Sequence, residues 1–139
     1  MATFVDSNVF VRLFTEDEPE KMKQAAALFK RAENNYIDLV VGPPVLFEVA
    51  WTLASTYKIP RGKILDVLEV IISFPNLKTL DKELVIAAIS LARETGCEFA
   101  DAYIAATAQS VKVDDVATFN KKHFKKLGVD LYSFNLYTH

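Results

Sequence analysis

Three carboxylates interrupt apolar stretches of this sequence. Asp6 follows the apolar residues 3–5, Glu48 lies inside the apolar stretch 45–51, and Asp101 lies among the small and aromatic residues 99–108. If the fold brings them together, their charges repel one another unless a cation neutralises them. A ligand set made only of oxygen atoms selects a hard ion, Mg2+ or Mn2+. Such an ion holds phosphates and activates water for in-line attack, so these residues predict phosphate chemistry.

Each carboxylate also has a structural alternative. An aspartate after a strand is commonly a turn or cap residue, which is the alternative for Asp6. Glu48 and Asp101 could instead lie near helix starts and interact with the helix dipole and solvent. A helix as apolar as the one around Glu48 is expected to be buried on all sides, and a buried carboxylate needs a partner.

Asn120 and the basic residues after it are the next candidates. The Asn120 side chain can coordinate an ion through its carbonyl oxygen, as a neutral and weaker ligand, or serve as a turn or cap residue. Residues 121–126 contain four lysines and His123. This run is either a solvated face or, beside a metal site, a contact for a nucleic-acid backbone. We leave His123 out of the ligand set, because it lies in this lysine-rich turn.

Hydrophobic periodicity, together with turn and cap residues, predicts the elements that position these side chains. Strands are expected at residues 3–5, 38–41, 77–80, 115–118 and 130–133. Helices are expected from the cap at Ser7 or Asn8 to about 14, from Pro19 to 34–35, from 42 to about 57, across 64–72, from about 84 to Gly96, and from about 99 to 111.

Strands that alternate with helices predict an α/β fold in which helices cover both faces of a parallel sheet of four or five strands. Ligands bind such sheets at the carboxyl edge. Asp6 ends the first strand, Glu48 follows the second, and Asp101 opens a helix that leads into a strand, so all three are expected at this edge. No linker, repeat or low-complexity tract is present, and we expect one domain over residues 1–139.

Composition and charge narrow the class of protein. The 16 basic and 18 acidic residues give a net charge of -2, which excludes a strongly basic nucleic-acid arm but allows a local basic patch. Cys97 is the only cysteine, so a disulfide within the chain and a cysteine-based zinc site are excluded, and we expect a buried side chain. Because no apolar run reaches the roughly 18 residues of a membrane span, we expect a soluble, cytoplasmic protein without membrane contact.

Four stretches resemble the successive motifs of PIN-domain proteins, especially the VapC-type toxins. They are residues 5–9 (VDSNV), 44–49 (PVLFEV), 99–108 (FADAYIAATA) and 116–124 (VATFNKKHF), and they occur in the right order over essentially the whole chain. The resemblance implies a three-layer α/β/α fold around a parallel sheet and a Mg2+- or Mn2+-dependent endoribonuclease. It also implies that Asp6, Glu48 and Asp101 bind the metal, and we expect Asn120 to assist catalysis.

The same resemblance implies a homodimer that acts on RNA and is inhibited by a small antitoxin, whose C-terminal segment occupies the active-site groove. Family members often carry aspartate where this chain has Asn120, so a second ion is expected to bind weakly or to arrive only with the RNA phosphate. The alternative is a PIN-like module that binds RNA or a protein without cutting it. A receiver domain or a haloacid-dehalogenase-like phosphatase fits worse, because the second acidic residue after Asp6 and a glycine-rich phosphate loop are missing.

Overall fold

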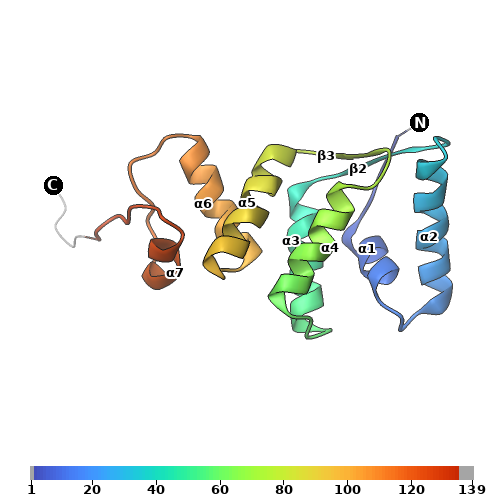
Figure 1. Cartoon of the computed structure of the whole chain (residues 1–139), viewed down its shortest axis with the longest axis horizontal. Helices are drawn as coiled ribbons and strands as arrows, with labels where there is room; N and C mark the ends of the chain where they lie inside the picture. The colour runs from blue at the N-terminus through green and yellow to red at the C-terminus, as the bar shows by residue number, and fades with distance from the viewer. Residues whose placement is uncertain (1, 135–139) are drawn as a thin grey trace. The chain divides into compact units, whose positions relative to one another are not determined.

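The computed structural model describes residues 2–134 and falls into two compact units, Met1–Lys82 and Glu83–His139. In chain order (Figure 1), the first unit contains β1 (Ala2–Phe4), α1 (Ser7–Phe14), α2 (Pro19–Glu33), β2 (Asp38–Val41), α3 (Pro43–Ser55), α4 (Arg61–Ile72) and β3 (Leu77–Thr79). The second contains α5 (Lys82–Thr95), which starts at the last residue of the first unit, α6 (Phe99–Ser110) and α7 (Lys121–Lys126). The single domain over residues 1–139 stays a prediction.

The three strands of the first unit form a parallel sheet in the order β1-β2-β3. Phe4 pairs with Val40, and Val40 pairs with Lys78, so the strands lie in register across the sheet. Residues alternate between two faces of a strand. Leu39, Val41, Leu77 and Thr79 share the buried face, whereas Phe4 and Lys78 on the other face are exposed. The mixed α/β fold with a parallel sheet is therefore confirmed.

Local sequence signals account for the helix ends of the first unit. Pro19 occupies the first turn of α2 and Pro43 that of α3, where a missing N–H costs nothing. Asn34 caps the end of α2, and Asn35 adopts a positive φ of 65° after it. The apolar faces of α3 and α4 then pack against each other, so the two predicted helices form a helical hairpin.

The second unit begins with two helices whose ends follow the predicted positions. Gly96 adopts a positive φ of 73° directly after α5, and its N–H donates to the carbonyl of Ala92, as expected of a C-terminal glycine. The free thiol of Cys97 is buried, as predicted. The small residues of α6 give it a closely packed face, with Ala102, Ala105 and Ala106 buried.

The prediction of four or five strands is wrong, because the described residues contain only three. Residues 115–118 and 130–133 make a single parallel bridge, between Val116 and Leu131. Its hydrogen bonds join Val116 N–H to the Asp130 carbonyl and Tyr132 N–H to the Val116 carbonyl, both at 2.8 Å. These segments lack a run of apolar residues to bury, and their flanking residues are exposed, so the pairing does not extend into strands. Within residues 2–134, no helix has the length and apolar character needed to cross a membrane.

Candidate functional site

Asp6 lies two residues after β1 and caps α1 itself. Its Oδ1 accepts a hydrogen bond of 2.7 Å from the backbone N–H of Ser7. The predicted caps, Ser7 and Asn8, are instead the first residues of the helix. The cap role considered for Asp6 is therefore confirmed for one carboxylate oxygen. Because the residue is exposed, its carboxylate can still meet an ion without a large desolvation cost.

Glu48 lies in the second turn of α3, and its surroundings differ from the expectation. The predicted burial of this helix on all sides is wrong, because Pro44, Glu48 and Trp51 form an exposed stripe, and Trp51 is 70% exposed. Their spacing of four and then three residues places them on one helix face. Val45, Leu46, Val49 and Leu53 form the buried face. Glu48 therefore needs no buried partner, and its carboxylate faces solvent.

Asp101 and Asn120 are brought together in the second unit, with His123 between them. Nδ1 of His123 lies 3.8 Å from Oδ2 of Asp101 and 3.0 Å from Nδ2 of Asn120. When the imidazole is neutral, the Asn120 amide can donate to Nδ1. Asp101 is in the first turn of α6, and Asn120 is the N-cap residue of α7 without a side-chain cap bond. Two predicted site residues thus meet through His123, which the predicted ligand set did not contain.

The spacing of His123 from Asn120 was the available signal for this contact. Residues three apart lie on the same side of a helix, so Asn120 at the start of a helix can reach His123. The predicted turn at residues 121–126 is wrong, because these residues form the short helix α7. Thr118 has a structural role, since its hydroxyl accepts a hydrogen bond of 3.0 Å from the Asn120 N–H and fixes the approach to α7.

Asp6 and Glu48 belong to the first unit, and Asp101 and Asn120 belong to the second. Among residues 2–134, the structure contains no group of three or more His, Cys, Asp or Glu side chains that could hold a metal ion. The convergence of the three carboxylates stays a prediction. Their chemistry nevertheless fits Mg2+ or Mn2+, because all three offer oxygen ligands and none is fully buried.

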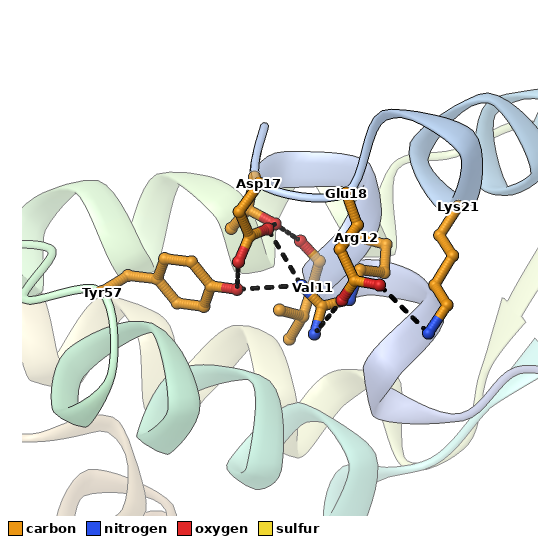
Figure 2. A network of polar contacts seen from close by, with 7 residues as sticks. Val11, Arg12, Asp17, Glu18, Lys21 and Tyr57 are labelled. Carbon is orange, nitrogen blue, oxygen red and sulfur yellow. Dashed lines mark hydrogen bonds and ion pairs between the residues drawn. The ribbon is translucent and has the colours of Figure 1, made fainter.

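A second constellation of charged residues, which we call the polar network, connects α1, the α1–α2 link and the residues after α3 (Figure 2). Nη1 of Arg12 lies 2.9 Å from Oδ1 of Asp17 and donates to the Tyr57 hydroxyl at 3.0 Å. That hydroxyl donates to Oδ2 of Asp17 at 2.7 Å. Glu18 lies between the two cations, 3.1 Å from Nη2 of Arg12 and 3.1 Å from Nζ of Lys21.

These contacts favour the charged forms of Asp17 and Arg12, the two central groups of the polar network. The hydrogen bond from Tyr57 lowers the pKa of Asp17, and further contributions come from Thr15 and Arg12. The hydrogen bond with Tyr57 also raises the pKa of Arg12, as do the carboxylates of Glu18 and Asp17.

A pocket of about 420 Å³ beside the network is lined by Asn8, Val9, Arg12, Lys21, Gln24, Ala25 and Leu28. Its two cations already have Glu18 as a partner, so the network is organised to hold elements together.

Comparison with known proteins identifies the family. A family model of the PIN domain matches residues 3–129, which is most of the chain and includes all four predicted site residues. The chain therefore belongs to the PIN domain family. A search of curated proteins finds no match to this chain. PIN domains are typically nucleases, so the chain has a nuclease-type fold.

Proposed function

We propose that this protein is a Mg2+- or Mn2+-dependent endoribonuclease that hydrolyses RNA phosphodiester bonds. The observation that supports this most is the PIN-domain match over residues 3–129. The match includes Asp6, Glu48 and Asp101, whose exposed or half-buried carboxylates are chemically suited to a hard ion. When bound, such an ion activates water and stabilises the leaving alkoxide.

The residues have distinct roles in this proposal. Asp6, Glu48 and Asp101 are the metal ligands. Asp6 is held in place by its hydrogen bond to Ser7 N–H, which fixes the direction of the carboxylate at the end of β1. Asn120 assists, and its contact with His123 restrains the amide beside Asp101. His123 thereby acts as a positioning residue for the second unit's part of the site.

The Asp101→Asn variant tests the activity. We expect the Mn2+-dependent cleavage rate of a single-stranded RNA to fall at least about a hundredfold, because a metal ligand supports several kcal/mol of transition-state stabilisation. Asn has nearly the same size as Asp, so the fold should be retained. Glu94→Gln, which changes an exposed carboxylate on α5, is the matched control and should cleave at the wild-type rate.

The alternative function is a PIN-like module that binds RNA or protein without catalysis. One observation favours it: Asn120 is neutral and is therefore a weaker metal ligand than a carboxylate. RNA binding without any cleavage, over many substrates and with both ions, would select this alternative.

We further propose that the protein is the toxin of a toxin–antitoxin pair and acts as a homodimer. The exposed Trp51 on α3 supports association, because tryptophan is enriched in protein interfaces relative to the rest of the surface. A short neighbouring gene that encodes a DNA-binding fold with a disordered tail would support the toxin role. Sedimentation of the purified protein measures its oligomeric state, and a monomer at all concentrations would contradict the dimer.

A further inference from the structure

Three aromatic rings gather on the surface of the second unit. Phe119 is 86% exposed, and Phe134 and Tyr132 are 44% and 43% exposed. The rings of Phe119 and Phe134 stack with centroids 4.6 Å apart and planes inclined by 13°. Tyr132 meets Phe134 edge-on, with centroids 5.3 Å apart and an interplanar angle of 86°. These rings order one another, yet they remain largely in contact with solvent.

The backbone explains why these rings meet. The parallel bridge pairs Val116 with Leu131, and its hydrogen bonds align the two chain segments. Phe119 lies three residues beyond Val116, and Phe134 lies three residues beyond Leu131. Equal steps from a parallel bridge bring residues side by side. The stack is therefore a consequence of the register of the bridge.

A row of cations follows directly in the sequence. α7 begins two residues after Phe119 and carries Lys121, Lys122, Lys125 and Lys126, all exposed. None of these four lysines is ion-paired with a residue in the described part of the chain. Phe124 and Leu127 are buried and fix the helix at its inner side. The carboxylates of Asp114, Asp115 and Asp130 line a different depression, next to Gly128 and Val129.

We propose that Phe119, Tyr132, Phe134 and the four lysines of α7, together called the aromatic–lysine surface, bind single-stranded RNA. An unpaired base would stack on the free face of Phe119, and the lysines would contact the phosphates on either side of it. Stacking on exposed aromatic rings beside a cationic track is how proteins hold single strands without sequence preference. The inference rests on the proposed function in one respect, since that proposal names RNA as the substrate.

The charge of the surface favours RNA over a protein partner. Protein interfaces are enriched in aromatic residues but depleted of lysine. Here four lysines that are not ion-paired within residues 2–134 lie within seven residues of Phe119, the most exposed of the three rings. A duplex would keep its bases stacked inside the helix, so the rings predict a preference for an unpaired strand.

The variant Phe119→Ala tests this surface. The probe is a short single-stranded RNA that contains one 2-aminopurine, measured by fluorescence in EDTA so that no cleavage occurs. We expect the Kd to rise about tenfold, because one stacked base is lost, and the fluorescence quenching that reports stacking to disappear. Phe119→Trp should retain both. The matched control is Tyr36→Ala, which removes another exposed aromatic ring, from the first unit, and should leave the Kd unchanged.

The outcomes separate this inference from the proposed function. An unchanged Kd and unchanged quenching for Phe119→Ala would overturn the inference, even if the wild-type protein cleaves RNA. A tenfold loss of binding would support the inference, even if no cleavage is found with Mn2+. If Phe119→Ala instead lowers the sedimentation mass and leaves RNA binding intact, the surface is a protein contact and the inference is wrong. Circular dichroism should show an unchanged fold, since Phe119 is hardly buried.

Discussion

The polar network of the first unit and the aromatic–lysine surface of the second use similar residue types in different ways. In the network, Arg12 and Lys21 share Glu18, and the Tyr57 hydroxyl both accepts from Arg12 and donates to Asp17. On the surface, the lysines of α7 are unpaired within residues 2–134, and the ring of Phe119 faces solvent. Cations with partners hold elements of the fold, whereas cations without partners remain available for a ligand.

The comparison also explains why net charge alone is a poor guide to nucleic-acid binding. The whole chain has a formal charge of -2, but its acidic residues are unevenly distributed along the sequence. Asp17 and Glu18 neutralise cations of the first unit, while α7 carries four lysines and no acidic residue. A chain with slightly negative charge can therefore present a local cationic surface.

Among the predictions from this comparison, the largest expected effect is a loss of RNA affinity when the lysines of α7 are replaced. Replacing Lys121, Lys122, Lys125 and Lys126 by Gln should weaken binding of single-stranded RNA more than about tenfold. The slope of log K against log salt should become shallower by about 0.7 for each lost phosphate contact. The control replaces Lys23 and Lys30 by Gln. These lysines lie near Glu20 and Glu33, so their replacement should change neither the RNA affinity nor the salt slope. An unaltered salt slope in the α7 variant would contradict the role of these lysines.

A smaller effect is expected from the centre of the polar network. Tyr57→Phe removes the hydroxyl that links Arg12 to Asp17, and we expect thermal unfolding to shift down by about 3 °C. RNA affinity should not change. The control is Tyr36→Phe, because the Tyr36 hydroxyl makes no hydrogen bond within the described residues. Equal melting temperatures for Tyr57→Phe and the wild type would mean that the network does not stabilise the first unit.

The smallest effect is the pH dependence of Asp17. Its pKa in the folded protein is lowered, first by the hydrogen bond from Tyr57, so ionised Asp17 stabilises the fold above the ordinary pKa of 3.8. This stabilisation is lost as the pH falls through the lower pKa of the folded state. Asp17→Asn should therefore melt below the wild type at pH 7, with a difference that narrows below about pH 3.8. A constant difference down to pH 2 would contradict the assignment.

The elements with strong local signals could be predicted from the sequence. Pro19 and Gly96 mark helix ends through backbone restrictions that act in any context, and residues 38–41 form β2 as expected. The same reasoning failed at residues 115–118 and 130–133, where the pattern resembled strands but offered too little apolar surface. Strand pairing depends on partners distant in the chain, which periodicity does not reveal.

The sequence predicted where the candidate site residues lie along the elements better than it predicted the burial and contacts of their side chains. Asp6, Asp101 and Asn120 lie at element ends, as their flanking sequences indicated. The solvent-facing position of Glu48 agrees with the structural alternative considered for it, whereas the predicted burial of its helix on all sides was wrong, because the apolar pattern also fits a helix with one exposed stripe that contains Trp51. His123 was missed because its contact with Asp101 joins residues 22 positions apart.

The central claim is that carboxylates of this chain support metal-dependent RNA cleavage. The most direct measurement is the single-turnover cleavage rate of a single-stranded RNA by the wild-type protein and by Asp101→Asn, with Mn2+ and with EDTA. We predict cleavage only by the wild type with Mn2+, while both proteins bind the RNA equally well in EDTA. Equal cleavage by the two proteins in Mn2+, or undiminished wild-type cleavage in EDTA, would contradict the claim.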